Sequence, residues 1–291
     1  MATPEGPDCT GGAARRAVRG IAALGRVTHP GPSLLVTLTT VAAATVLLHR
    51  VVGMSTALRI TAVVLPAQLA IGAVNDLVDR ADDTAAGRRD KPLVTGAAST
   101  AAARAVAVLG VAVSLLAAGL TSRSALAVAV GGLGAGLAYD LGLKRTLLSP
   151  VPWWVGFACV PLGAAAVAGT GLPAPRVLAP LSLLLALGLH AANAMPDLAD
   201  DRRAGVRSLP VRIGPGATRG VALLTMVGAS VVAVAAAPRL GQSLSTVALG
   251  AAVPAFVALW VLHAHRIARP FAVLAPATLP LVVTWLAALP T

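Results

Sequence analysis

The sequence predicts an all-α membrane protein, a polytopic bundle of about nine transmembrane helices with two pseudo-repeats around a central cavity. The 291 residues are 57% hydrophobic and only 12% charged, and the mean hydropathy is +0.82. This composition is typical of a chain that lies mostly in lipid. Eight of the eleven acidic residues fall in two similar stretches, residues 75–96 and 193–214. The composition predicts the membrane bundle, and the duplicated stretch predicts its internal repeat.

Nine apolar segments have the length of about 20 residues that a helix needs to cross a bilayer. They cover residues 32–49, 57–77, 97–120, 123–143, 150–170, 177–198, 217–237, 243–263 and 271–289. We therefore expect a single membrane domain over residues 29–291, preceded by a cytoplasmic tail and interfacial helix over residues 1–28. Within that tail, residues 13–28 alternate arginines with apolar residues, which fits either an interfacial helix or ordinary flanking charges.

Basic residues are distributed unevenly across the predicted membrane. If the N-terminus is cytoplasmic, 18 of the 23 lysines and arginines lie on the inner side, as the positive-inside rule requires. This distribution explains the net charge of +12 without a nucleic-acid partner. We predict a multi-pass protein of the cell membrane with its N-terminus and active site on the cytoplasmic side. Cys9 and Cys159 show no metal-ligand spacing and predict no disulfide.

The two acidic stretches are related by a constant offset of 118 residues. The offset carries Asn75, Asp79 and Asp83 onto Asn193, Asp197 and Asp201, and it aligns Gly87, Arg89, Pro92 and Gly96 with Gly205, Arg207, Pro210 and Gly214. Four predicted spans lie between the copies, so both copies enter the membrane in the same direction. This arrangement is typical of a parallel internal repeat, with the two acidic helices facing each other across a central cavity.

In each stretch the polar residues recur at every fourth position. On a helix such residues share one face and rise about 6 Å per step, and Asp76 lies beside that face. Carboxylates at this spacing can converge on a hard divalent cation that substrate phosphates complete, as in Mg²⁺ sites. The alternative is a solvated acidic loop, but the repetition of the pattern on the same side of the membrane argues against it. The spacing therefore predicts a metal site.

Basic and aromatic residues accompany the acidic stretches. Arg88, Arg89 and Lys91 follow the first stretch and suit a diphosphate, although cytoplasmic loop charges explain some of them equally well. Arg89 is favoured because the repeat gives it a partner, Arg207. Tyr139, the single tyrosine, ends the fourth span and is either an interfacial anchor or part of the site.

Two further features of the apolar spans have competing interpretations. Trp153, Trp154 and Phe157 either line a pocket and face a cation through their rings or face lipid, and we favour lipid. His190 precedes Asn193 by one helical turn, and we favour a packing role for it over a role in the cavity.

These residues resemble the UbiA superfamily of intramembrane prenyltransferases, and the resemblance covers most of the chain. Helix number, motif positions and the inward-facing side all agree with the family. The family's NDxxDxxxD motif is matched by Asn75, Asp76, Asp79 and Asp83, its DxxxD motif by Asp197 and Asp201, and its Tyr-x-x-x-x-Lys element by Tyr139 and Lys144. One departure is the segment GRRDKPL after Asp83, where ubiquinone-branch members have a slightly longer loop ending in Arg-Pro-Leu, so that Lys91 stands in for that arginine.

The resemblance implies a Mg²⁺-dependent transfer of a prenyl group from an allylic prenyl diphosphate to an aromatic or other small acceptor, or to a lipid acceptor, within the membrane. The implied catalytic and metal-binding residues are Asp76, Asp79, Asp83, Asp197 and Asp201. The implied diphosphate-binding residues are Asn75, Asn193, Lys144, Tyr139, Arg89, Lys91 and Arg207. Loss of diphosphate leaves an allylic carbocation, so metals and cations that stabilise the leaving group lower the barrier. A water-poor cavity protects that cation.

Other activities remain open at this point. Within the superfamily they are terpene cyclisation, lipid O-prenylation and phosphoribosyl transfer onto a polyprenyl phosphate. The CDP-alcohol phosphatidyltransferases need a DG-x2-AR run, which neither acidic stretch contains. A repeat-built transporter would place its ionisable residues near the bilayer midplane, whereas here they lie at helix ends. No residue is singled out as a base for a phenolic acceptor.

Overall fold

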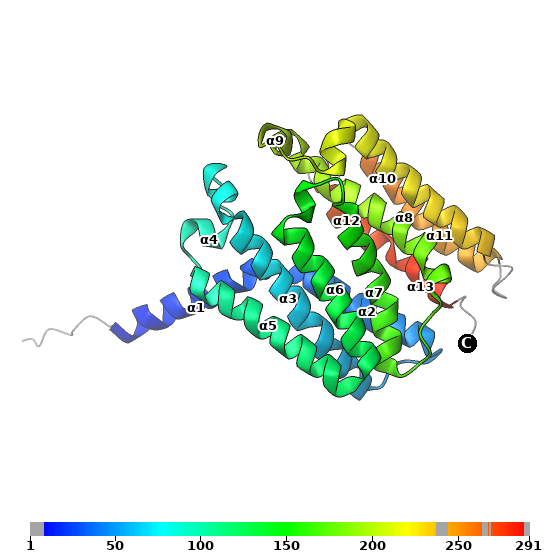
Figure 1. Cartoon of the computed structure of the whole chain (residues 1–291), viewed down its shortest axis with the longest axis horizontal. Coiled ribbons are helices and arrows are strands. Elements are labelled where there is room, and N and C mark those ends of the chain that lie inside the picture. Colours follow the sequence, from blue (N-terminus) through cyan, green and yellow to red (C-terminus); the bar gives the residue numbers. More distant parts are fainter. Residues whose placement is uncertain (1–8, 237–243, 264–266, 268, 288–291) are drawn as a thin grey trace, which may run out of the picture.

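The computed structural model describes residues 9–236, 244–263, 267 and 269–287, and within them all regular secondary structure is helical (Figure 1). The α-helices are α1 (Cys9–Val27), α2 (Pro30–Leu47), α3 (Met54–Ala85), α4 (Pro92–Thr95), α5 (Thr100–Thr121), α6 (Arg123–Leu141), α7 (Pro150–Ala168), α8 (Pro175–Ala194), α9 (Leu198–Arg203), α10 (Leu209–Ala236), α11 (Leu244–His263), α12 (Pro270–Ala277) and α13 (Leu279–Ala287). Two 3-10 turns, η1 (Leu143–Arg145) and η2 (Met195–Asp197), complete the order.

Seven helical segments in the described part of the chain are long and apolar enough to cross a membrane. They are Pro30–Leu47, Met54–Ala85, Thr100–Thr121, Arg123–Leu141, Pro150–Ala168, Leu178–Arg203 and Leu209–Ala235. Two shorter apolar segments, Ala252–Val261 and Pro270–Val283, follow them. The predicted all-α membrane bundle is therefore confirmed, whereas the count of nine transmembrane helices stays a prediction.

Local sequence signals explain where several of these helices begin. Ser99 accepts a hydrogen bond from the amide of Ala102 at 3.1 Å and so caps α5. Ser122 does the same for α6 through the amide of Ala125 at 3.0 Å. Serine at this position satisfies an amide that the first helical turn leaves without a partner. The two caps set the starts of neighbouring helices within a few residues of the predicted ones.

The last predicted span, residues 271–289, is wrong as a single helix. The structure divides it into α12 and α13, which meet at Thr278. Pro276 and Pro280 flank that residue, and proline both lacks an amide donor and crowds the preceding turn. Residues 288–289, together with residues 237 and 243 of two other predicted spans, lie outside the described residues.

Small residues allow the helices of the bundle to approach closely, as in other membrane proteins. α3 packs most extensively against α5, and a Cβ added to Gly110 of α5 would lie 2.5 Å from the carbonyl oxygen of Pro66. On the outside, large apolar side chains remain uncovered, including Leu120 at 80% and Phe256 at 70% exposure. This outer surface suits contact with lipid.

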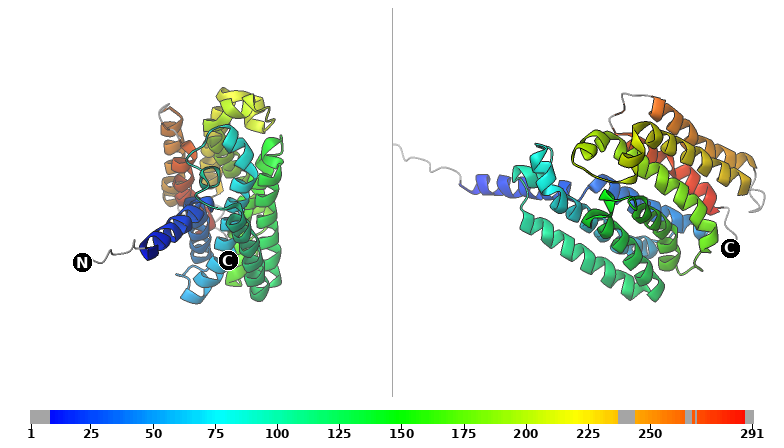
Figure 2. Two further views of the ribbon diagram at one scale, coloured as in Figure 1. Left: turned by 90° about the vertical axis from the view of Figure 1, so that its left-hand side faces the viewer. Right: turned by 45° about the horizontal axis from the view of Figure 1, so that its top comes forward.

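The acidic stretches lie at one end of the bundle, where α4 and α9 project together (Figure 1). The loop after α6 joins them there, because the amide of Arg207 donates to the carbonyl oxygen of Arg145 at 3.1 Å. α1 points away from the bundle in both views (Figures 1 and 2). Its last turns bury Ala23 and Val27, whereas Ile21 is 71% exposed, and its interfacial location stays a prediction.

Candidate active site

A cavity of about 420 Å³ lies inside the bundle and reaches the end that carries the acidic stretches. Its walls come from α2, α3, α6, α7, α8 and α12. The polar side chains that line it are His29, Ser33, Gln68, Asn75, Tyr139, Asp140 and Asn193. The cavity therefore joins the polar end of both predicted repeats to the apolar interior.

The first acidic stretch (residues 75–96) begins on an uninterrupted helix, because α3 continues to Ala85. Asn75, Asp79 and Asp83 consequently share one helical face, as their spacing predicted. Asp79 is 26% exposed and Asp83 is 14% exposed. Asp76 differs from both because it is only 2% exposed.

Cationic side chains neutralise the carboxylates of this first stretch. Lys144 donates from Nζ to Oδ1 of Asp79 at 2.6 Å. Lys91 donates from Nζ to Oδ1 of Asp76 at 2.6 Å and lies 3.9 Å from Oδ2 of Asp83. Oδ1 of Asp76 also hydrogen-bonds Nε2 of His29 at 2.9 Å. Both lysines are less than one fifth exposed, and such partly buried pairs are screened little by solvent.

Asp140 is a site residue that the sequence reasoning did not assign. It is 3% exposed, and its Oδ1 accepts a hydrogen bond from Nδ2 of Asn75 at 2.9 Å. Nζ of Lys144 lies 4.0 Å from the same oxygen, while Oδ2 has no hydrogen-bond partner among the described residues. The signal was present in the sequence, since Asp140 is the one acidic residue after the tail that lies outside both repeated stretches.

The second acidic stretch (residues 193–214) does not form the continuous helix that was predicted. α8 ends at Ala194, residues Met195–Asp197 form η2, and α9 begins at Leu198. Pro196 accounts for the change, because it cannot donate the hydrogen bond that would continue α8. The expectation that Asn193, Asp197 and Asp201 share one α-helical face is therefore wrong.

Despite this break, the second stretch lies close enough to the first for their carboxylates to interact electrostatically. Asp201 interacts electrostatically with Asp79 and with Arg145. Tyr139 interacts electrostatically with both Asp79 and Asp201. Asp197 and Asp201 form no hydrogen bond or ion pair with any described side chain, whereas Asp200 pairs locally with Arg203. Asp197 and Asp201 thus differ from Asp76 and Asp79 because neither has a direct cationic partner among the described residues.

The backbone repeats at the predicted offset of 118 residues even where the helices differ. The amide of Ala86 donates to the carbonyl oxygen of Asp82 at 2.9 Å, and the amide of Ala204 donates to that of Asp200 at 2.9 Å. Gly87 and Gly205 follow with φ of 68° and 72°. Gly96 and Gly214 likewise have φ of 71° and 83°. Positive φ favours glycine, so each pair marks an equivalent helix end or turn.

The loop arginines divide into paired and unpaired residues. Arg145 donates to Oδ2 of Asp82 at 2.9 Å, and Arg88 binds both oxygens of Asp90 at 3.0 and 3.1 Å. The Arg88 guanidinium holds the pKa of the Asp90 carboxyl below its ordinary value. Arg89 and Arg207 are exposed, and neither side chain forms an ion pair with a described residue. Their predicted contact with diphosphate stays a prediction.

Aromatic rings line the cavity beside the acidic residues. The Trp153 ring centroid lies 6.0 Å from that of Tyr139, 6.4 Å from that of Phe157 and 5.7 Å from that of Phe271. All four residues contact the cavity. The favoured lipid-facing interpretation of Trp153 and Phe157 is therefore wrong. Because α7 is apolar on every side, its sequence does not indicate which face points into the bundle. That orientation is set by packing against the neighbouring helices.

Trp154 and His190 have packing contacts within the bundle. Nε1 of Trp154 donates to Oγ of Ser182 on α8 at 3.1 Å, so this ring is also directed toward a neighbouring helix. His190 is 3% exposed, and its Nε2 hydrogen-bonds Oγ of Ser149 at 3.0 Å. Its ring also contacts those of Tyr139 and Trp153, which agrees with the packing role favoured from the sequence.

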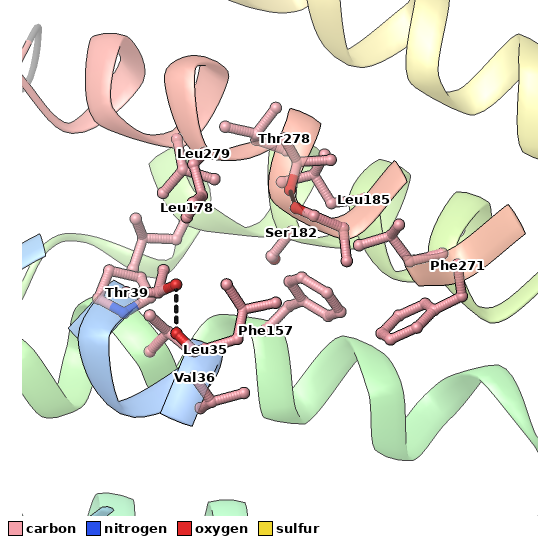
Figure 3. Close-up of a pocket in the computed structure, with 16 residues that line it drawn as sticks. Leu35, Val36, Thr39, Phe157, Leu178, Ser182, Leu185, Phe271, Thr278 and Leu279 are labelled. Atoms are coloured by element: carbon pink, nitrogen blue, oxygen red, sulfur yellow. Dashed lines mark hydrogen bonds between the residues drawn. The ribbon is translucent and has the colours of Figure 1, made fainter. Parts of the chain in front are cut away.

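An apolar branch leads away from the cavity between α2, α7, α8, α12 and α13 (Figure 3). It has a volume of about 120 Å³ and shares Val36, Phe157, Val160 and Phe271 with the cavity. The hydroxyls of Thr39 and Thr278 donate to the backbone carbonyls of Leu35 and Ala275. The branch therefore presents hydrocarbon to any ligand.

The acidic residues fit a divalent cation that also binds a ligand. Among the described residues, no three Asp, Glu, His or Cys side chains gather closely enough to enclose a metal ion. Mg²⁺ does not require such a cage, because one or two carboxylates together with substrate phosphates and waters complete its shell. Asp79, Asp83, Asp197 and Asp201 offer this oxygen chemistry on two facing elements. Asp76 is less available, since its Oδ1 already has two partners.

The all-helical bundle, with its acidic stretches at one end of an internal cavity, is that of a polytopic membrane protein. The chain belongs to the UbiA prenyltransferase family, which its sequence matches over residues 34–287. This match confirms the resemblance stated from the motifs. No significant match was found among curated protein sequences.

Solved structures of family members share the fold. A UbiA homologue from Aeropyrum pernix K1, solved in its apo form, is 22% identical with a TM-score of 0.69, over 86% of this chain and 94% of that one. A UbiA homologue from Archaeoglobus fulgidus bound to GPP and Mg²⁺ is 15% identical with a TM-score of 0.69, over 91% and 99% of the two chains. A digeranylgeranylglyceryl phosphate synthase is 15% identical with a TM-score of 0.68, over 93% and 99%.

Proposed function

We propose that this protein transfers a prenyl group from an allylic prenyl diphosphate to an aromatic or other small acceptor, with Mg²⁺ as cofactor. One observation carries the proposal. Asn75 and Asn193, the first residues of the two repeated acidic stretches, both line a cavity with aromatic walls, and an apolar pocket shares four lining residues with that cavity. The Archaeoglobus fulgidus homologue bound to GPP and Mg²⁺ supports the donor class and the cofactor.

In the proposed reaction, the two developing charges lie at different ends of the cavity. The bond between the allylic carbon and the diphosphate oxygen breaks, and its electron pair leaves with the diphosphate. The allylic cation then accepts an electron pair from the acceptor, which loses a proton as the new bond forms. Charge develops on the leaving diphosphate and on the allylic carbon, so preorganised groups of opposite sign at those two positions lower the barrier.

Four carboxylates would hold Mg²⁺ in this proposal: Asp79 and Asp83 from the first stretch and Asp197 and Asp201 from the second. When bound, Mg²⁺ neutralises the diphosphate and stabilises the charge that develops as it leaves. Asp76 has a different part, because its contacts with Lys91 and His29 hold that lysine beside the site. Asn75 and Asn193 line the cavity next to the carboxylates and contribute amide contacts to the diphosphate.

Lys144 and Lys91 would bind the diphosphate together with Tyr139, Arg89 and Arg207. The two lysines already lie within the acidic cluster and form hydrogen bonds of 2.6 Å to carboxylates. An ammonium has three donors on a flexible stem, so each lysine can exchange a carboxylate for a phosphate oxygen with a small movement. The exposed guanidinium groups of Arg89 and Arg207 approach from the loops of the two repeats.

Trp153 and its neighbours would protect and stabilise the allylic cation. A cation within about 6 Å of an aromatic ring face is attracted by roughly 0.5–2 kcal/mol. The rings also exclude water, which would otherwise capture the cation. The prenyl tail occupies the apolar branch of Figure 3, whose lining offers no unpaired polar side chain.

Location in the cell membrane, with the N-terminus and the active site on the cytoplasmic side, is part of the proposal. The apolar exterior of the bundle and the excess of basic residues at the end that carries the site support it.

Membranes that contain the protein test the function directly. They are incubated with Mg²⁺, labelled prenyl diphosphates of several lengths and a panel of acceptors, and both diphosphate release and prenylated products are measured. We expect release that depends on Mg²⁺ and that Asp79→Ala combined with Asp197→Ala abolishes. Release that persists in this double variant contradicts the metal-site assignment. A cyclised hydrocarbon formed without any acceptor would instead indicate a terpene cyclase.

A further inference from the structure

Gln68 is a polar side chain deep in the cavity that the proposed reaction does not use. It lies on α3, seven residues before Asn75, so the two amides share a helical face about 10 Å apart along the axis. Both line the cavity. The side chain of Gln68 forms no hydrogen bond with any residue that the structure describes. Gln68 is half-buried, and its amide is accessible from the cavity, so it is free to hydrogen-bond a ligand there.

A second branch is lined in part by Gln68 and lies between α2, α3, α5, α6 and α7, with a volume of about 90 Å³. The other polar side chains that line it have partners within the bundle. Ser114 donates from Oγ to the carbonyl oxygen of Val63 at 2.7 Å, and Thr40 donates to that of Val36 at 2.8 Å. Hydrogen bonding therefore distinguishes the two branches, because this one offers an unpaired amide and the branch in Figure 3 offers none.

The walls beside Gln68 leave room for a ligand of ring size. Gly132 on α6 and Gly156 on α7 line both the cavity and this second branch. A Cβ added to Gly156 would meet no atom within 4 Å, so the space in front of it is open. Phe157 and Trp153 flank Gly156 on the cavity side of the same helix. A planar group in this space would have aromatic rings on one side and the Gln68 amide at its far edge.

We propose that Gln68 is the recognition residue for the acceptor, which would be a planar aromatic or quinoid molecule with a hydroxyl or carbonyl group. The amide of glutamine both donates and accepts hydrogen bonds, so it can bind either group. This orientation places the opposite edge of the ring toward the diphosphate end of the cavity. The inference rests on the proposed function and adds the residue that recognises the acceptor and the side of the cavity where the acceptor binds.

Binding of model aromatics to the full chain in nanodiscs tests the inference. The probes are 1-naphthol, 1-methoxynaphthalene and naphthalene, measured by calorimetry with Mg²⁺ and an unreactive geranyl thiolodiphosphate present, and with empty nanodiscs to subtract partition into lipid. We expect 1-naphthol to bind more tightly than naphthalene, by about three- to ten-fold for one neutral hydrogen bond. In Gln68→Leu that preference disappears while the affinity for naphthalene stays the same.

Two further variants separate recognition from general damage to the fold. Thr40→Val is the matched control, because it removes a polar group from the same branch whose hydroxyl already has a backbone partner, and it should keep the preference for 1-naphthol. Gly156→Leu fills the open space and should abolish binding of all three probes while leaving thiolodiphosphate binding intact. Loss of thiolodiphosphate binding by the unmodified protein would count against the proposed function itself. Donor binding without any preference for 1-naphthol, or a preference that survives in Gln68→Leu, overturns the acceptor assignment alone.

Discussion

The two acidic stretches have the same backbone but a different electrostatic environment. Both end in the same helix-terminating hydrogen bond, followed by glycines of positive φ at an offset of 118 residues. In the first stretch, Asp76 and Asp79 each bind a lysine at 2.6 Å. In the second, Asp197 and Asp201 have no such partner among the described residues. The sequence explains the difference, since the offset places Leu209 opposite Lys91 and Ala194 opposite Asp76.

This difference indicates that the two halves of the site contribute differently to ligand binding. In the first stretch, the carboxylates already bind Lys91 and, from the turn after α6, Lys144, and both lysines can transfer their hydrogen bonds to a diphosphate. In the second stretch, Asp197 and Asp201 have no ion pair with a described residue, so their oxygens are free to bind a divalent cation. The two stretches therefore share a backbone conformation, but the first is suited to binding an anion and the second to binding a cation.

The largest expected effect is the loss of activity when one metal-site carboxylate is neutralised, and this loss should be similar for the two acidic stretches. Asp79→Asn and its repeat partner Asp197→Asn each remove one charged oxygen donor from the diphosphate end of the cavity. Each should lower the rate of diphosphate release by about 10²- to 10³-fold, as for other groups that stabilise developing charge. The rate is measured with labelled donor at saturating Mg²⁺. Full activity in either variant would show that this half does not take part in the reaction.

Stability in the absence of ligand should distinguish the two halves. Lys91→Leu and Asp76→Ala are two single variants, and each gives the first stretch the residue found at the equivalent position of the second. Each removes the 2.6 Å bond, while Asp76 keeps His29 and Lys91 keeps Asp83 at 3.9 Å, so each should lower the free energy of unfolding by about 2 kcal/mol. The double variant should lose clearly less than the sum of the two, because neither charge remains alone.

Thermal unfolding in detergent measures this series, with Asp197→Asn as the matched variant in the second stretch. That variant should not lower the melting temperature, because Asp197 has no ion pair to lose. Strict additivity of the two substitutions in the first stretch would contradict a direct interaction between Lys91 and Asp76.

The smallest effect should come from Asp82 and Asp200, the exposed carboxylates near the ends of α3 and α9. Asp82 is 65% exposed and binds Arg145 of another loop, whereas Asp200 is 72% exposed and binds only its neighbour Arg203. Exposed pairs of this kind contribute about 0.2–1 kcal/mol. Asp82→Asn should therefore lower the melting temperature slightly and less so at high salt, and Asp200→Asn should leave it unchanged. A larger effect for Asp200→Asn would reverse this ranking.

The sequence predicted those features of the fold and the site that depend on neighbouring residues alone. The apolar segments, the repeat and the shared face of Asn75, Asp79 and Asp83 depend on composition and helical period, and the structure shows each of them. The break at Pro196 was overlooked, although proline carries that signal in the sequence. The inward orientation of Trp153 could not be predicted, because α7 is apolar all round and its rotation depends on distant helices.

The ion pairs of the site were also beyond local reasoning. Lys91 and Lys144 were selected as diphosphate contacts from their positions in motifs, but no spacing rule pairs Lys144 with Asp79, which lies 65 residues away. The bond between His29 and Asp76 joins residues 47 apart and had no signal in the sequence. Such contacts are set by the packing of α2, α3 and α6, which only the three-dimensional structure provides.

The order in which the two halves bind a cation tests the account most directly. Mn²⁺ serves as a paramagnetic substitute for Mg²⁺, and its binding to the full chain is followed by electron paramagnetic resonance, first without donor and then with geranyl thiolodiphosphate. We predict that Mn²⁺ alone binds at the second stretch, so that Asp197→Asn with Asp201→Asn abolishes binding and Asp79→Asn with Asp83→Asn does not. With the thiolodiphosphate present, both pairs of substitutions should weaken binding, because the lysines of the first stretch then have phosphate oxygens as partners. Donor-free binding that depends on Asp79 and Asp83 instead would contradict the assignment of the two halves.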